Sequence, residues 1–156
     1  MSRRNYQDHD RRDQNLSNLW PGYLAKGYFD DKGHLWTEYV GREKVEHLAE
    51  AMANAYPPLN KHQLRRFFQH CRRIEARLKS KSASWAEVYP DVKKLDIAAA
   101  DGFGKSSRKI PELFYEFIKM NVAKVNLEKD FLEGFLPHFE ALVGFGSLHF
   151  KERERS

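Results

Sequence analysis

Cysteine is almost absent from this 156-residue chain, in which Cys71 stands alone. A single cysteine cannot form an internal disulfide, and it leaves no cysteine pair for a zinc or iron–sulfur site. The lone thiol is expected to be a small buried apolar side chain rather than a nucleophile or redox group. A chain without disulfides suits the reducing cytoplasm.

Long apolar runs are missing as well. No segment approaches the roughly 18 consecutive apolar residues that a membrane-spanning helix needs. The basic residues near the start, Arg3 and Arg4, are followed by polar residues, whereas a secretory signal has an apolar stretch there. We therefore expect a soluble, cytoplasmic protein without a membrane partner.

The sequence also has no recognisable catalytic or metal-binding motif. Its seven histidines are scattered, and none stands at metal-ligand spacing from another histidine or an acid. The segment Asp101–Ser106 has the glycines and the Lys-Ser pair of a phosphate loop, but it lacks the first glycine of that motif and follows no strand. We expect no catalytic residue, no metal site and no cofactor, and we predict that the chain is not an enzyme.

What the chain does contain is typical of a folded helical domain. Hydrophobic residues make up 41% and charged residues 31%, with 11 Phe, 7 Tyr and 3 Trp to supply buried area. Apolar side chains recur at helical spacing in segments that predict an all-α fold, a compact bundle of about five helices: 42–56, 60–79, 85–100, 107–125 and 128–143. The predicted organisation is a flexible polar arm (1–19), one helical domain (20–150) and a charged tail (151–156).

Several residues mark the expected boundaries of these helices. Asn60 is a good N-cap for the 60–79 helix, and Ser84 with Glu87 has the spacing of a capping box for the next one. Prolines should end or divide helices: Pro57 and Pro58 after the first, Pro90 within the third and Pro137 within the last. Asp30-Asp31-Lys32-Gly33 is a turn signal, which predicts a small hairpin or an ordered loop near residues 27–38.

The positive charge is concentrated in the 60–79 helix. Between Leu59 and Lys81 there are eight basic residues and one acid, Glu75, which gives this segment a charge of +7 (8 − 1) in a chain of net charge +5. On a helical wheel the apolar side chains share an arc about 120° wide. The opposite arc carries Arg65, Arg66, Arg72, Arg73 and Arg77, with His62 and Gln69 among them.

Such a face is unusual for a plain solvated surface. Exposed helix faces commonly mix lysine with glutamate, whereas like charges along one face repel each other unless a partner compensates them. Guanidinium groups form bidentate contacts with phosphates. We predict a polyanion-binding face that holds a nucleic-acid backbone and does not read its bases. It has no Phe, Tyr or Trp on which a base could stack.

A second basic cluster consists of Lys105, Arg108 and Lys109. The sequence places it in the glycine-rich loop and first turn of the 107–125 helix. Glycine-rich backbone and helix N-termini both bind phosphate, so a second backbone contact is expected here.

Several short runs resemble a known family, the small helical subunit of the Csm effector complex of type III-A CRISPR systems. The run LNKHQLRRFF at 59–68 is similar to the family's LTTSQIR helix start, and FEALVGF at 139–145 resembles its EALVAY ending. The loop at 101–105 and the piece at 27–33 also look like family members. In total the resemblance covers about residues 27–150. Asn60 and Lys61 replace the threonine pair, Gly144 and Phe145 replace Ala and Tyr, and the charged tail is unusual.

The resemblance implies a non-catalytic subunit that contacts crRNA and target RNA without base specificity. It also implies partners, namely other Csm subunits and further copies of the same chain. Carried onto this sequence, the RNA-binding positions would be Lys61, Arg65, Arg66, Arg72 and Arg73, with Lys105, Arg108 and Lys109 as secondary positions.

Two alternatives remain at this point. The arginine face could dock on an acidic protein, which would make the chain a helical protein–protein adaptor. The 42–56 and 60–79 pair could also belong to a helical DNA-binding regulator, although Pro57-Pro58 fits the turn of a helix-turn-helix poorly.

Overall fold

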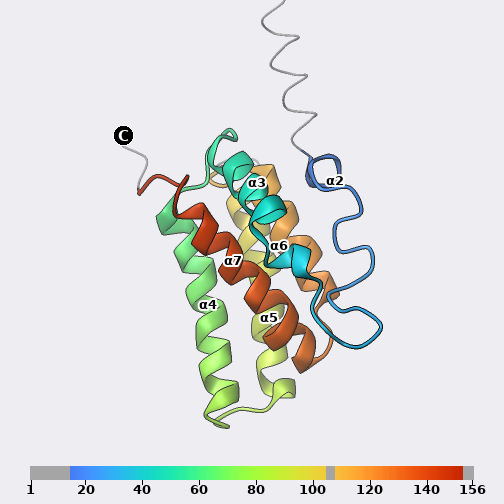
Figure 1. Ribbon diagram of the computed structural model, residues 1–156. Coiled ribbons are helices and arrows are strands. Elements are labelled where there is room, and N and C mark those ends of the chain that lie inside the picture. Colours follow the sequence, from blue (N-terminus) through green and yellow to red (C-terminus); the bar gives the residue numbers. More distant parts are fainter. Residues whose placement is uncertain (1–14, 105–107, 153–156) are drawn as a thin grey trace, which may run out of the picture.

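The structure, a computed structural model, describes residues 15–104 and 108–152 (Figure 1). Residues 1–14, which are most of the predicted arm, and residues 153–156 of the predicted tail lie outside this range. The chain forms α2 (Leu16–Leu19), η1 (Thr37–Tyr39), α3 (Arg42–Ala53), α4 (Lys61–Lys79), α5 (Trp85–Phe103), α6 (Glu112–Lys124), η2 (Asp130–Phe135) and α7 (Leu136–Gly146). No strand occurs within the described ranges, so the predicted all-α fold is confirmed.

Helix α4 forms one side of the bundle and packs against both α5 and α7 (Figure 1). Helix α5 packs in turn on α6, and α7 packs on α3. The centre is filled by aromatic rings that are fully buried and contact one another in stacked, tilted and edge-to-face pairs: Phe114, Phe117, Phe131, Phe135 and Phe139. These rings supply much of the buried apolar area that holds the helices together.

The predicted caps are present. Both α4 and α5 begin with capping boxes, in which the side chains of Asn60 and Ser84 accept from the backbone N–H three residues on. Helix α3 ends at Ala53, ahead of the proline pair, as expected. The suggestion that Pro90 divides the third helix is wrong, since α5 is continuous. The carbonyl of Ala86, which loses its partner there, lies on the exposed side of the helix where water can replace the lost bond.

Two other boundaries differ from the prediction. Helix α5 continues to Phe103, so residues 101–103 are helical rather than part of a loop. Helix α6 starts at Glu112, because Pro111 disfavours helical geometry at the residue before it. Arg108 and Lys109 therefore lie in a non-helical connection and not on a first helical turn. The division expected near Pro137 is confirmed, as η2 is a π-helix and Pro137 stands in the first turn of α7.

The segment from Asn15 to Val40 packs across α6, η2 and α7 as an ordered loop. Its expected hairpin is reduced to a single antiparallel bridge between Phe29 and Leu35. The described residues also include the end of the predicted arm, from residue 15 to residue 19. Asn15 caps α2, and Leu16 is completely buried, so apolar burial holds this turn onto the bundle.

A buried polar network fixes this segment in place. His138 on α7 lies 2.6 Å from the Tyr39 carbonyl through Nδ1 and 2.7 Å from the Tyr23 hydroxyl through Nε2. The Asn121 amide nitrogen donates to the Tyr23 hydroxyl, and the Tyr28 hydroxyl donates to the Asn121 amide oxygen. Because every polar side-chain atom in this network has a partner, its burial carries no desolvation penalty from an unmade bond.

Candidate nucleic-acid interface

Helix α4 has the two faces that the sequence predicts. Leu64, Cys71, Ile74 and Leu78 are buried, and Phe67 and Phe68 pack on the core from the margins. Burial raises the pKa of the Cys71 thiol to about 12, so this group stays protonated and acts as an apolar side chain. The capping box fixes where the helix starts, and the start sets which residues face outward.

The middle of the outer face is an arginine ridge made of His62, Arg65, Arg66, Gln69 and Arg73. All five residues are exposed. Arg65, Arg66 and Arg73 form no ion pair, hydrogen bond or ring contact with any residue in the described part of the chain. Three guanidinium groups therefore stand side by side without a carboxylate.

The flanks of the same helix are different, because acids from neighbouring helices reach them. On the α7 side Arg72 pairs with Glu75 at 2.8 Å and with Glu140 at 3.5 Å. On the α5 side Arg77 pairs with Asp91 at 2.9 Å. The expectation that the whole arginine face is unmatched is thus wrong for Arg72 and Arg77. The Arg72–Glu75 pair has the i,i+3 spacing that a sequence shows, whereas Glu140 and Asp91 are distant along the chain and could not be predicted as partners.

The charges of these pairs are mutually stabilised. The hydrogen bond with Glu75 raises the pKa of Arg72. Partial burial acts to raise the pKa of Glu75, but hydrogen bonds from Arg72 and Lys79 outweigh burial and lower it. Hydrogen bonds from Lys94 and Arg77 likewise hold the pKa of Asp91 below its usual value. These arginines are already engaged, whereas the ridge arginines are not.

The second basic cluster lies at the N-terminal end of α4. The Gln63 amide donates to the Lys109 carbonyl at 2.7 Å, which joins the connection before α6 to the first turn of α4. The Lys61 backbone N–H donates to the Lys151 carbonyl at 2.8 Å, and the Lys61 ammonium lies 3.5 Å from Glu152. The backbone of Lys151 thus lies at this end as well, although nothing in the sequence pointed to it.

Arg108 is held in place by an aromatic ring. Its guanidinium lies 4.7 Å from the Phe103 ring centre, and Phe103 stacks on Tyr115 at 4.7 Å. This stack orders Arg108 beside the C-terminal end of α5, where a cation is favourable. Lys105, the third member of the predicted cluster, lies outside the described residues.

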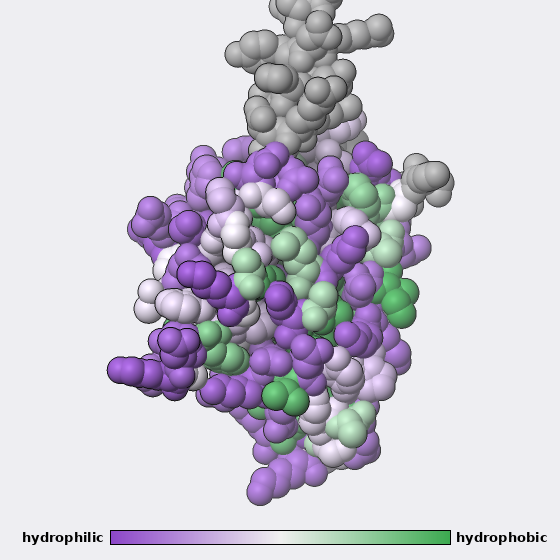
Figure 2. Space-filling model, turned by 90° about the vertical axis from the view of Figure 1, so that its right-hand side faces the viewer, coloured by the Kyte–Doolittle hydropathy of each residue, from purple (hydrophilic) through white to green (hydrophobic). Residues whose placement is uncertain are grey.

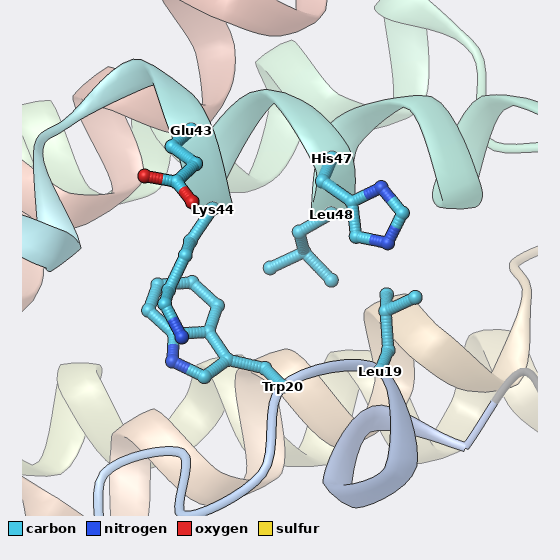
Figure 3. A pocket seen from close by; sticks show the side chains of 6 residues that line it. All are labelled: Leu19, Trp20, Glu43, Lys44, His47 and Leu48. Atoms are coloured by element: carbon cyan, nitrogen blue, oxygen red, sulfur yellow. The ribbon is translucent and has the colours of Figure 1, made fainter.

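A pocket on another part of the surface is a weaker candidate. Between α2 and α3, Leu19 and Trp20 face Glu43, Lys44 and His47, with Leu48 at the base (Figure 3). The Lys44 ammonium lies 5.6 Å from the Trp20 ring centre and partly covers the ring.

The face turned toward the viewer in Figure 2 is mostly hydrophilic, with apolar residues in separate small groups.

Residues 15–104 and 108–152 contain no cluster of three or more His, Cys, Asp or Glu side chains that could hold a metal ion. No helix within these same ranges is long and apolar enough to cross a bilayer.

Comparison with known proteins identifies the family of the helical part of the chain. No curated protein and no solved structure matches the chain. The family model for Csm2 of type III-A matches residues 41–152, which include every helix from α3 to α7. The piece at 27–33 that resembles family members lies outside the match. The match covers well over half of the sequence, and the chain therefore belongs to the Csm2 family, the small subunit of the type III-A CRISPR Csm complex.

Proposed function

We propose that the chain is a non-catalytic subunit that binds the crRNA and target RNA backbone within the type III-A complex, independently of sequence. The observation that carries this proposal is the state of three arginines. Arg65, Arg66 and Arg73 are exposed on one ridge and unpaired within the described residues, while Arg72 and Arg77 beside them are neutralised.

Phosphate is the natural partner of such a ridge. A guanidinium can make two parallel hydrogen bonds to a phosphate, and it is less strongly hydrated than an ammonium. Arg66 and Arg73 are seven residues apart, which is about 10 Å along the helix axis and places them on one line of the surface. The ridge can therefore follow a strand over more than one phosphate.

Recognition through this ridge would not depend on base identity. Phosphate contacts position a strand but carry no sequence information. None of the five ridge residues is Phe, Tyr or Trp, and the imidazole of His62 is the one aromatic ring among them. A subunit of this kind suits a guide complex, in which base pairing between two RNAs supplies the specificity.

The remaining predicted positions would make secondary contacts. Lys61 and Lys109 lie at the N-terminal end of α4, where Lys61 would have to exchange Glu152 for a phosphate. Arg108 and Lys105 complete this set of proposed secondary positions. Arg72 would have to exchange Glu140 for a phosphate. The proposed assembly partners are other Csm subunits of the complex and further copies of this chain.

The test is a charge-reversed ridge with a matched control. The variant Arg65→Glu/Arg66→Glu/Arg73→Glu is compared with Lys26→Glu/Lys32→Glu/Lys124→Glu, which changes the net charge equally on exposed residues outside α4. Binding of a mixed-sequence single-stranded RNA at low salt is followed by fluorescence anisotropy, and circular dichroism checks the fold. The ridge variant should lose binding, and the control should keep most of it.

Equal losses in both variants would mean that net charge alone drives binding, and the ridge assignment would be wrong. The adaptor alternative makes a different prediction. If the wild-type chain binds no RNA in isolation and its ridge variant still supports RNA binding in the assembled complex, the ridge contacts a protein.

A further inference from the structure

Tyr56, in the connection between α3 and α4, is the most exposed large apolar side chain of the described residues, with 83% of its surface accessible. Its side chain forms no hydrogen bond and no ring contact with any residue of 15–104 and 108–152. A single exposed apolar residue is common on protein surfaces and does not mark a site by itself. Tyr56 differs from such residues in how its backbone is held and in the charge that surrounds it.

The backbone on both sides of Tyr56 is held in place. Ala55 and Leu59 are buried, and the Leu59 N–H donates to the carbonyl of Met52 in the last turn of α3 at 3.1 Å. The two prolines that follow Tyr56 restrict the backbone further, because their rings fix φ. A ring presented from an anchored connection loses little backbone entropy when it binds a partner.

The connection leads into the basic end of α4. Lys61 stands five residues after Tyr56, at the first position of the helix. The Lys61 N–H donates to the Lys151 carbonyl, and the Lys109 carbonyl accepts from a side chain in the same helical turn, so three lysine residues lie at this end. One of them, Lys61, is paired with Glu152 at 3.5 Å. Figure 1 shows the α3–α4 connection, the start of α4 and the end of the described chain together at one end of the bundle.

An aromatic ring beside lysines fits a nucleic acid better than an apolar protein surface. Proteins that hold single strands combine a positively charged surface with aromatic rings on which bases stack, and this stacking tolerates any base because every base has a π-face. The arginine ridge has no Phe, Tyr or Trp of its own, so Tyr56 supplies what the ridge lacks. Ile97 and Leu127 are also well exposed, but their aliphatic side chains cannot stack.

We propose that Tyr56 stacks on an unpaired base of an RNA strand whose phosphates lie along the arginine ridge. This inference rests on the proposed function, in which the ridge holds the strand. Lys61 precedes Arg65 by about one turn, or roughly 6 Å along the helix axis. A strand that follows the ridge toward the start of α4 passes Lys61 and then reaches the connection that carries Tyr56.

The contact divides the recognition of RNA between two chemical groups. The ridge contacts phosphates, which are present in paired and unpaired strands alike, whereas a base is available to Tyr56 only outside a duplex. Tyr56 should therefore favour single-stranded over double-stranded RNA without favouring any one base.

Three substitutions at this position separate stacking from simple apolar contact. Tyr56→Ala and Tyr56→Leu should each weaken the binding of a mixed-sequence single-stranded RNA by about tenfold, because neither side chain has a ring. Tyr56→Phe should bind like the wild type, since stacking does not need the hydroxyl. Fluorescence anisotropy at low salt measures binding, and circular dichroism checks that the fold is unchanged.

A strand without bases completes a thermodynamic cycle. An abasic strand of the same length keeps the phosphates but offers no base to Tyr56. It should bind the wild type about tenfold more weakly than the normal strand does, while Tyr56→Ala should bind both strands equally. If removal of the bases weakens the wild type and Tyr56→Ala to the same extent, Tyr56 contacts no base and the proposal is overturned.

Trp36→Ala is the matched control. Trp36 is also an exposed aromatic residue beside a lysine, with the Lys26 ammonium 6.0 Å from its ring centre, but it lies outside the connection to α4. The control should keep the wild-type affinity. Equal binding by Tyr56→Leu and Tyr56→Phe would refute stacking. If Tyr56→Ala binds RNA normally but no longer joins the Csm complex, Tyr56 contacts a protein and the proposal is wrong.

The charge-reversed ridge variant, measured with the same RNAs, keeps the two proposals apart. Loss of binding in that variant together with wild-type affinity in Tyr56→Ala refutes only the stacking contact. Normal binding by the ridge variant together with the expected effects at Tyr56 refutes only the ridge. A wild-type chain that binds neither strand overturns both.

Discussion

At the scale of single residues, the same side-chain type has two different states on α4. Arg77 shares Asp91 with Lys94, and Arg72 is shared between two glutamates. Arg66 and Arg73 have no such partner within the described residues. A phosphate that approaches Arg77 must compete with a carboxylate already in place, whereas one that approaches Arg66 meets no carboxylate from the described residues. The unpaired arginines should therefore contribute most of the binding free energy.

This difference predicts unequal effects of two alanine substitutions. Arg66→Ala should weaken single-stranded RNA binding by about tenfold, the usual value of a hydrogen-bonded contact to a charged group. Arg77→Ala should weaken it much less, and the loss of its exposed ion pair should lower stability by under about 1 kcal/mol. Anisotropy titrations at one salt concentration and chemical denaturation measure both. Equal losses of RNA affinity would show that ion pairing on the flanks does not matter.

The buried histidine predicts a pH dependence of stability. Desolvation lowers the pKa of His138 from 6.5 to about 4, although the bond to the Tyr39 carbonyl opposes the shift. Between these values the unfolded chain binds a proton that the folded chain does not. The contribution of neutral His138 is therefore complete above pH 6.5 and is lost as the pH falls toward 4, by roughly 3 kcal/mol in total.

Thermal unfolding of the wild type and of His138→Gln across this pH range measures the effect. The variant should be less stable at pH 7 because its amide cannot reproduce both hydrogen bonds. Its Tm should also fall less between pH 6.5 and 4. Parallel curves for the two proteins would contradict the assignment of this pH dependence to His138.

At the scale of elements, the sequence predicts a helix start or a buried helix face correctly where nearby residues alone determine it. The caps at Asn60 and Ser84 and the buried stripe of α4 follow from spacing and from the N-cap preferences of single residues. The continuity of α5 through Pro90 depends on solvent exposure of the helix side, which a sequence does not give. The start of α6 is also locally determined, since Pro111 disfavours helical geometry at the residue before it.

The candidate site was predictable to a similar extent. The identity and position of the ridge arginines come from helical periodicity alone. Their separation into paired and unpaired groups depends on Glu140 and Asp91, which are brought to α4 by tertiary packing. The approach of Lys109 and Lys151 to the N-terminal end of α4 likewise depends on long-range hydrogen bonds.

The π-helix η2 predicts an intolerant glycine. A Cβ on Gly134 would lie 2.6 Å from the Cγ atom of Tyr28, so the Tyr28 ring would have to move away from Asn121. Gly134→Ala should therefore lower the free energy of unfolding by about 1–3 kcal/mol, as overpacking of a core does. Gly144→Ala is the matched control. Its Cβ meets no atom, and the better helix propensity of alanine should raise stability by up to about 1 kcal/mol.

Urea denaturation of both alanine variants separates the two expectations. If Gly134→Ala is as stable as the wild type, the Tyr28 ring is not held closely against η2. Attachment of the 15–40 segment would then depend on other contacts, such as the hydrogen bond between Lys129 and the Gly33 carbonyl.

At the scale of the whole molecule, the helices that match the family model and the segment before them share one core. The family match begins at residue 41, yet Trp20, Tyr23 and Tyr28 from the preceding segment are buried against α6, η2 and α7. The segment therefore covers one side of the helical unit, while none of the described residues covers the outer face of α4. Exposure of the basic helix is a property of the folded chain and not of its overall composition.

The net charge of +5 is small for a nucleic-acid-binding protein, so the salt dependence of binding should reveal a local site. Each phosphate neutralised on a single strand contributes about 0.7 to the slope of log affinity against log salt. Replacing Arg65, Arg66 and Arg73 together by alanine should therefore reduce the slope by about 2 if each contacts one phosphate. The control Lys26→Ala/Lys32→Ala/Lys124→Ala loses the same charge and should keep the wild-type slope. Two RNAs of unrelated sequence should give the same result, because backbone contacts are the same in both. A slope that falls equally in the two triple variants would mean that RNA responds to the total charge of the molecule and that the ridge is not a distinct site.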